Sequence, residues 1–137
     1  MQSFILDSLP LLTFFRKQYG WERINRLLKE AQTSRQRHLM SAINWGEVYY
    51  TVLRDEGSQV AEIVQDRISR SPIEIILPSM EQIIQAARFK SNGGISYADC
   101  FAGALAIERN LPVLTGDPEF KKLEELGVRV EWLPPNR

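Results

Sequence analysis

The stretch Tyr97–Ile107 constrains the fold of this chain more than any other, because it is apolar on every side of a helix. Asp99 is the only charged residue of this stretch, and its neighbours are mostly alanine and other apolar residues. A helix without a polar face is a buried helix. An isolated carboxylate in such surroundings is costly unless it is paired, hydrogen-bonded or bound to a cation. The stretch therefore predicts a central helix and requires a partner for Asp99.

Short apolar runs alternate with helical patterns along the rest of the chain. We expect strands at residues 4–6, 38–41, 73–77, 113–115 and 128–133. We expect helices at residues 9–15, 21–31, 58–68, 97–107 and 118–126, with Ser58 as the cap of the third and Asp117 as the cap of the last. Two more helices should begin at a cap on Ser41 or Asn44 and at the capping-box pattern Ser79–Gln82. Strands separated by helices imply a parallel sheet covered on both faces through right-handed crossovers. The predicted fold class is α/β, a three-layer α/β/α sandwich with a small, mainly parallel sheet in a single domain over residues 1–137, ending in a tail at 134–137.

Composition excludes several classes of protein. The single Cys100 cannot form an intrachain disulfide, and its place in the apolar helix favours a core residue over a nucleophile. The single His38 excludes a histidine-rich zinc cluster and leaves a Ser/His/Asp triad only one base. No apolar run approaches the roughly 20 residues that span a bilayer, and the N-terminus lacks the basic region of a signal peptide. We therefore expect a cytoplasmic protein without a membrane partner.

Charge is unevenly placed along a chain whose formal net charge is zero. Residues 1–40 contain seven basic residues and three acidic ones, a local balance of +4, and the remainder carries the compensating negative charge. A basic N-terminal face beside an acidic pocket is compatible with nucleic-acid binding. An ordinary solvated helix face explains the same charges equally well.

Four carboxylates fall where the predicted strands end or the following helices begin: Asp7, Glu47, Asp99 and Asp117. Open parallel sheets place their sites beyond the carboxyl ends of the strands, so we expect the four to converge. Each also has a structural explanation on its own, because helix N-termini favour anions and Asp117 precedes a proline in the manner of an N-cap. Together the four like charges would raise one another's pKa, and a divalent cation removes that conflict.

Oxygen ligands of this kind suit Mg²⁺ or Mn²⁺, and metal ions held by shared carboxylates are a recurring solution for cutting phosphodiester bonds. No Walker lysine loop and no GxGxxG motif accompany the acids, which disfavours the nucleotide-binding folds that use them.

The acids lie in four segments, namely Phe4–Asp7, Asn44–Tyr50, Ile95–Ala102 and Leu114–Phe120. In order and spacing these segments resemble the acidic motifs of PIN-domain ribonucleases, and more narrowly those of the VapC-type toxins of bacterial and archaeal toxin–antitoxin pairs. The last two segments are the most specific. The resemblance extends over nearly the whole chain.

This resemblance implies that Asp7, Glu47, Asp99 and Asp117 ligate Mg²⁺ or Mn²⁺, with Asp7 and Asp99 as the direct ligands. It places Thr115 where a hydroxyl orients a metal-bound water and Ser8 where a small hydroxyl is usual. Leu9 departs from the small polar residue often found in the first motif. Glu119 stands where the pattern often has Asp, and we interpret it as a peripheral acid in the first turn of a helix.

The resemblance also implies an RNA substrate, a homodimer, and a cognate antitoxin that covers the acidic site and inserts a basic side chain. The apolar residues of the second helix, Trp21, Ile24, Leu27 and Leu28, form either a groove for that antitoxin or part of the core.

Two other functions are compatible with the same residues. One is a PIN-like scaffold that binds RNA or a protein and does not cut. The other is a phosphatase of a different α/β fold that uses Asp7 as a nucleophile, although Leu9 stands where such enzymes have a second aspartate.

Overall fold

The computed structural model describes residues 1–134, which form five strands and seven helices. In chain order the elements are β1 (Ile5–Leu6), α1 (Ser8–Phe15), α2 (Trp21–Ser34), β2 (His38–Ser41), α3 (Ala42–Glu56), α4 (Ser58–Ser69), β3 (Ile73–Ile76), α5 (Met80–Lys90), α6 (Tyr97–Arg109), β4 (Val113–Thr115), α7 (Phe120–Glu125) and β5 (Val130–Trp132). From residue 135 onward the predicted tail lies outside the described residues. Over residues 1–134, no helix has the combination of length and apolarity needed to cross a bilayer.

The five strands form one sheet in the order β3-β2-β1-β4-β5, and every neighbouring pair is parallel. Ile5 pairs with Leu39 of β2 on one side and with Val113 of β4 on the other. Helices connect the strands, as a parallel sheet requires. The predicted α/β fold class is therefore confirmed, with a sheet that is wholly rather than mainly parallel.

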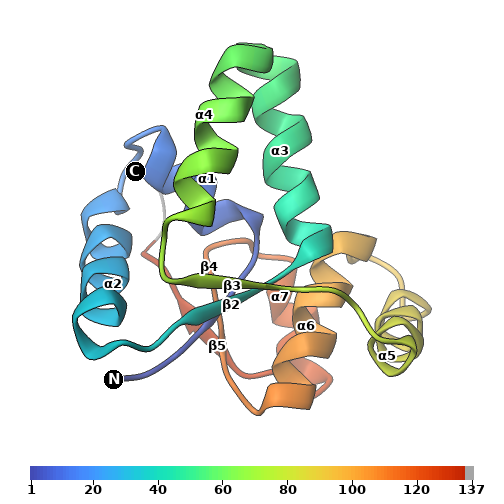
Figure 1. Cartoon of the computed structure of the whole chain (residues 1–137). Helices are drawn as coiled ribbons and strands as arrows, with labels where there is room; N and C mark the ends of the chain where they lie inside the picture. The colour runs from blue at the N-terminus through green and yellow to red at the C-terminus, as the bar shows by residue number, and fades with distance from the viewer. Residues whose placement is uncertain (135–137) are drawn as a thin grey trace.

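Side chains that alternate along the strands divide the core into two layers. Ile5 packs in a cluster with residues of α5, α6 and α7, whereas Leu6 packs with residues of α1, α2, α3 and α4. Their sheet neighbours alternate in the same way, with Leu39 and Val113 on the first face and Met40 and Leu114 on the second. The result is a helix layer on each side of the sheet, and the α3–α4 hairpin projects beyond the body of the molecule (Figure 1).

The helix α6 is buried along most of its length, as its apolar sequence predicts. Its residues from Asp99 to Ala106 are all buried, including Cys100, which is a core residue. A Cβ added to Gly103 would lie 3.4 Å from the side chains of Leu123 and Phe89, so the absence of a side chain there lets α7 and α5 approach closely.

Of the two caps predicted for α3, Ser41 is confirmed, and it accepts a hydrogen bond from the amide of Ile43. Two other predicted caps or helix starts are wrong by one or two residues. Gly57, rather than Ser58, is the N-cap of α4. The helix expected from residue 118 begins at Phe120. In each case the tertiary path of the chain sets the first helical residue among several that the local sequence allows.

The predicted capping box at Ser79–Gln82 is only half formed. Ser79 accepts a hydrogen bond from the amide of Gln82, but the Gln82 side chain donates to Glu108 of α6 at 2.5 Å and does not return to Ser79.

The two interpretations of the apolar face of α2 are partly resolved. Ile24 and Leu28 are buried in the core, so they cannot form the wall of an exposed groove. Trp21 and Leu27 are half-buried, and the Trp21 ring lies 6.4 Å from that of Phe14. Core packing therefore accounts for Ile24 and Leu28, while Trp21 and Leu27 stay partly accessible.

Candidate metal centre

The carboxyl ends of β1, β4 and β2 meet at one edge of the sheet, and each is followed by a predicted site residue. Asp7 follows β1 directly, and Asp117 lies two residues beyond the end of β4. Glu47 lies in the second turn of α3, the helix that begins where β2 ends. Asp99, in the first turn of α6, completes the group.

Three of the four predicted acids form a tight cluster. Asp7, Asp99 and Asp117 each offer a carboxylate oxygen, and the three oxygens lie within 4.8 Å of one another. A single Mg²⁺ ion with ligands at about 2.1 Å has ligand oxygens up to about 4.2 Å apart. The cluster is thus only slightly wider than the ligand shell of one such ion.

Thr115 holds Asp7 in place. Asp7 is 1% exposed, and its Oδ2 accepts a 3.0 Å hydrogen bond from the Thr115 hydroxyl. That hydroxyl also accepts a 3.0 Å hydrogen bond from the backbone amide of Asp117. Thr115 therefore links two acids of the cluster, and its predicted role in orienting a metal-bound water stays a prediction.

The other oxygen of Asp7 has no hydrogen-bond partner among the described residues, although it is buried. Burial raises the pKa of this carboxyl well above its ordinary value, and the charges of Asp117 and Glu47 raise it further. The Thr115 hydrogen bond acts in the opposite direction. An unpartnered buried carboxylate oxygen is unusual in a folded protein, and a bound cation would satisfy it.

Asp99 is 3% exposed and belongs to the N-terminal turn of the buried helix. Its backbone amide donates a 3.2 Å hydrogen bond to the Ser96 hydroxyl, which caps α6. Burial raises the pKa of Asp99 to about 9, with contributions from a hydrogen bond to Glu119 and from the charges of Asp7 and Asp117. Unless a cation compensates its charge, the carboxyl group of Asp99 is therefore more stable in its neutral, protonated form.

Glu47 lies in the same cavity but outside the three-acid cluster. Its carboxylate accepts a short hydrogen bond from the Ser8 hydroxyl, at the first residue of α1. The small hydroxyl at Ser8 therefore orients Glu47.

The cavity contains a fifth acid that the sequence interpretation treated as peripheral. Glu119 lines the cavity, and its Oε2 accepts a 3.2 Å hydrogen bond from the amide of Ser96. The amide of Glu119 donates a 3.0 Å hydrogen bond to Asp117 Oδ1. Asp117 therefore caps the turn that precedes α7, which begins at Phe120. The spacing of Asp117 and Glu119 around Pro118 was the available signal, since both acids precede the same helix.

All five acids line one cavity of about 300 Å³, together with Ser8, Leu9, Leu12 and Ser96. Among these lining residues none is basic. Five carboxylates that converge without a cation of the chain repel one another, and a divalent ion relieves that repulsion. The donor set is all oxygen, which suits Mg²⁺ or Mn²⁺ rather than zinc. The residues present therefore fit the metal that the acids predict.

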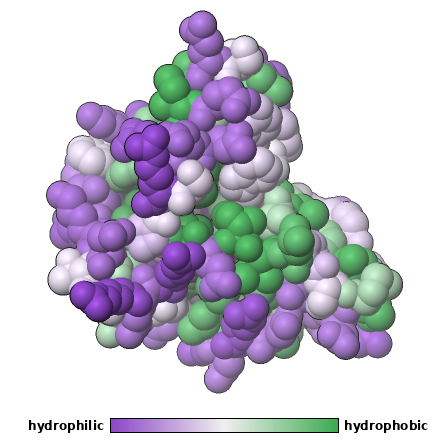
Figure 2. All heavy atoms as spheres, viewed as in Figure 1, coloured by the Kyte–Doolittle hydropathy of each residue, from purple (hydrophilic) through white to green (hydrophobic). Residues whose placement is uncertain are grey.

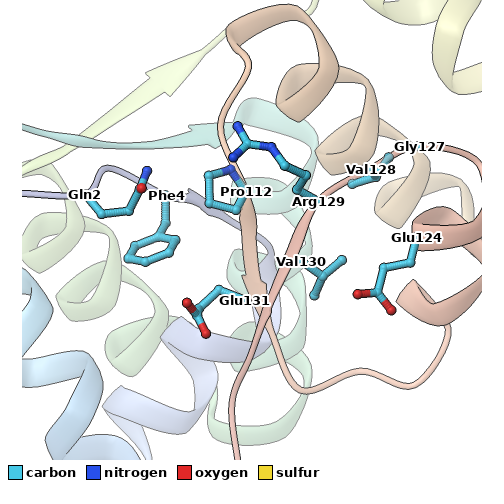
Figure 3. A pocket seen from close by; sticks show the side chains of 9 residues that line it. All are labelled: Gln2, Phe4, Pro112, Glu124, Gly127, Val128, Arg129, Val130 and Glu131. Carbon is cyan, nitrogen blue, oxygen red and sulfur yellow. The ribbon is translucent and has the colours of Figure 1, made fainter.

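A wider hollow of about 610 Å³ lies elsewhere, between the N-terminal segment and β5 (Figure 3). Its three charged side chains, Glu124, Arg129 and Glu131, point in different directions (Figure 3). Each has a partner of its own: Trp132 for Glu124, Asn110 for Arg129 and Arg23 for Glu131. This hollow has no convergent group of reactive side chains.

His38 is excluded as a catalytic base of the acidic site. It starts β2, at the sheet edge opposite the acids, and is 1% exposed. Its Nδ1 accepts a 3.1 Å hydrogen bond from the amide of Phe4, so its Nε2 carries the proton and donates to Leu27 at 3.1 Å. Burial lowers the pKa of His38, which makes it a neutral structural residue.

The sequence as a whole matches one family model, that of the PIN domain, over residues 4–126. No curated protein sequence matches the chain.

Solved structures of similar fold come from bacterial toxin–antitoxin systems. A chain of DNA-bound VapBC from Salmonella typhimurium is 22% identical with a TM-score of 0.71, covering 96% of this chain and 98% of that one. VapBC2 from Rickettsia felis, bound to a promoter DNA fragment, gives 18% identity and a TM-score of 0.72, with 95% and 98% covered. VapC20 of Mycobacterium tuberculosis, a toxin that cleaves the sarcin–ricin loop, gives 13% identity and a TM-score of 0.70, with 96% and 100% covered.

Proposed function

Because this chain belongs to the PIN domain family, we propose that it is a metal-dependent endoribonuclease that hydrolyses phosphodiester bonds of RNA. One observation carries the proposal: the oxygens of Asp7, Asp99 and Asp117 lie within 4.8 Å of one another in a cavity lined by five acids and no basic residue. A cavity of this charge repels a polyanion, and a bound divalent ion would reduce that repulsion and offer a ligand position to a phosphate oxygen.

We assign Asp7, Asp99 and Asp117 as the residues that hold Mg²⁺ or Mn²⁺, with Glu47 as the fourth acid of the site. When bound, the ion supplies Lewis-acid activation of a water molecule and stabilises charge on the attacked phosphate. Thr115 fixes the orientation of Asp7, and Ser8 fixes that of Glu47. Glu47 lies outside the cluster, which leaves its carboxylate available to accept a proton from water on the open side of the cavity.

The expected experiment measures cleavage of labelled RNA with Mg²⁺ or Mn²⁺, with and without EDTA. Asp7→Asn and Asp99→Asn should each lower the rate by more than about 100-fold, since even the outer partners of metal ligands are worth 10- to 100-fold. Glu125→Gln, at an exposed position of α7, is the control and should cut as the wild type does. Cleavage that survives both site substitutions would refute the assignment. Metal binding without cleavage would instead support a PIN-like scaffold that binds RNA or protein.

We further propose that the protein acts as the toxin of a toxin–antitoxin pair. The solved structures of similar fold include VapBC complexes, in which a toxin and an antitoxin are bound together. The acidic cavity supports such a partner, because a lysine or arginine inserted among the five carboxylates would replace the metal's charge and block the site. Growth arrest on expression, relieved by co-expression of the neighbouring gene and absent for Asp99→Asn, tests this role.

We also propose that the protein forms a homodimer. The exposed side of α5 and the connection that precedes α5 support this assembly. Leu77 and Met80 are 80% and 69% exposed, and Ile84 is also exposed. A hydrophobic patch is visible on the face of the molecule near α3, β3 and α5 (Figure 2). Glu81 and Arg88 lie three and four residues on either side of Ile84. A twofold axis at Ile84 would pair each Glu81 with Arg88 of the partner subunit.

Light scattering tests the dimer and its surface together. Ile84→Glu should reduce the measured mass to that of one chain, because it buries an unpaired charge at the axis. Ile63→Glu, on the exposed face of α4, is the control and should keep the wild-type mass. A wild-type protein of monomeric mass would refute the proposal.

A further inference from the structure

A group of basic residues lies apart from the acidic site and has no acidic partner. Of the seven basic residues in the first 40, Arg16 pairs with Asp55, and Arg23 pairs with Glu131. Arg26, Lys29, Arg35 and Arg37 make no salt bridge with any residue in the range 1–134. Arg26 and Lys29 lie in the middle of α2, and Arg35 and Arg37 lie in the connection that follows it.

Two of these arginines line a groove. The groove has a volume of about 310 Å³ and lies where the C-terminal ends of α2 and α4 meet the starts of β2 and β3. Its lining residues are Ala31, Gln32, Arg35, Gln36, Arg37, Ser69, Arg70, Ser71 and Pro72, and none of them is acidic. The side of the molecule formed by α2 and the lower end of α4 is largely hydrophilic, in contrast to the patch near α5 (Figure 2).

A structural role at the helix ends does not account for the arginine side chains. Cations at a helix C-terminus offset the dipole and can cap the last carbonyls. Here the last turn of α2 is capped by the backbone, since the amides of Arg35 and Gln36 donate to Gln32 and Ala31. The guanidinium groups of Arg35 and Arg37 make no hydrogen bond with the described part of the chain. Arg70 bonds Asp66 at 2.5 Å on the rim, which leaves the other two unmatched.

We propose that this groove binds the phosphodiester backbone of RNA at a distance from the site of cleavage. The inference rests on the proposed ribonuclease function and adds a second contact surface to it. Guanidinium groups bind phosphate oxygens in a planar, bidentate geometry, and such contacts position a nucleic acid without reading its sequence. Two arginines in a polar groove, Arg35 and Arg37, are unpaired within residues 1–134 and supply this chemistry, whereas the acidic cavity supplies none of it.

The groove lies at the amino ends of the strands, and the acidic site lies at their carboxyl ends. Arg37 directly precedes β2, and α3 with Glu47 begins where β2 ends. A four-residue strand spans roughly 13 Å, so an RNA must pass around the molecule over several nucleotides to touch both. The groove therefore favours long substrates and contributes nothing to the binding of very short ones.

RNA binding in EDTA separates this contact from cleavage, because chelation removes the metal that cutting requires. Anisotropy is measured for a labelled RNA of about 20 nucleotides and one of about four, across a range of salt concentrations. The test variant is R35Q/R37Q, which keeps much of each stem and removes both charges. The matched control is R54Q/R109Q, which removes the same charge from exposed positions outside the groove. Urea unfolding confirms that each variant is folded.

We expect R35Q/R37Q to weaken binding of the long RNA roughly tenfold and to lower the salt-dependence slope by about 1.4, which is 0.7 for each phosphate contact. The short RNA and the control variant should show no change, and R35K/R37K should restore most of the slope. An unchanged slope in R35Q/R37Q overturns the groove while leaving the ribonuclease proposal intact. Binding of labelled polyglutamate is measured in the same way. If R35Q/R37Q loses polyglutamate binding while its RNA binding is unchanged, the occupant of the groove is an acidic polypeptide and the proposal is overturned. A wild-type protein that neither binds nor cuts RNA overturns both proposals.

Discussion

Individual side chains of the acidic site are held by partners that differ from residue to residue. Asp7 depends on the Thr115 hydroxyl, Asp99 on the cap at Ser96, and Glu47 on Ser8. These contacts fix the carboxylates before any ion arrives, so metal binding requires little rearrangement of the protein. The cost appears as raised pKa values for Asp7 and Asp99 in the metal-free protein.

The pKa of Asp99 predicts how the stability of the metal-free protein depends on pH. Because that pKa is raised from an ordinary 3.8 to about 9, the native state binds more protons than the unfolded state between these values. Stability should therefore fall as pH rises through this range, by up to about 1.4 kcal/mol per pH unit. Asp99→Asn should be more stable than the wild type in EDTA at pH 8, with little difference near pH 4.

Urea unfolding in EDTA at several pH values measures this effect. Glu125→Gln serves as the control and should follow the wild-type pH dependence. A gap between Asp99→Asn and wild type that does not widen with rising pH would contradict the prediction.

Thr115→Val tests the hydroxyl that joins two acids. Valine has nearly the same shape, so the change removes the hydrogen bond to Asp7 and the one from the Asp117 amide. Leaving such groups unsatisfied should cost roughly 1–3 kcal/mol of unfolding free energy and should weaken Mg²⁺ binding in calorimetry. Thr115→Ser keeps the hydroxyl and should retain most of both properties. Equal metal affinity in the two variants would show that the hydroxyl does not position the acids.

At the level of helices and strands, two serine caps offer a matched comparison. Ser96 caps α6 next to Asp99, and Ser79 caps α5 away from the acids. Alanine at either position should cost about 1 kcal/mol of stability, since each removes one cap hydrogen bond. Only Ser96→Ala should also weaken metal binding, because the turn it releases carries Asp99. Similar metal affinities for the two variants would place Ser96 among purely structural residues.

One contact between helices could not be predicted from the local sequence. Asn44, expected as a possible cap, is instead buried inside α3, and its Nδ2 donates a 3.1 Å hydrogen bond to the carbonyl of Ala98 in α6. This bond joins the helix of Glu47 to the helix of Asp99. A buried amide within a helix looks like a cap in the sequence, and only the packing of α3 on α6 shows its partner.

For the molecule as a whole, metal binding should raise the melting temperature. At a metal concentration 100 times the Kd the gain is about 2.7 kcal/mol, which for a chain of this size corresponds to a rise on the order of 10 °C. EDTA should reverse the rise. The double variant D7N/D99N should show none, and an equal rise in that variant would mean that the ion binds elsewhere. Metal affinity should increase with pH, since the ligands must lose their protons.

Local patterns in the sequence predict the order of strands and helices, the buried character of α6 and a set of four acids at one end of the strands, three of which cluster. Hydrophobic periodicity and a helix without a polar face are local patterns, and the rule that parallel strands place their carboxyl ends at one edge converts them into a common site. Other features of the site follow from tertiary packing: Glu47 lies outside the cluster, and Glu119 lies inside the cavity. Packing also brings Thr115 to Asp7, and it gathers Arg35, Arg37 and Arg70 in one groove. Each depends on the distance between side chains from elements far apart in the sequence. Such distances follow from how the helices pack on the sheet, and no local pattern encodes them.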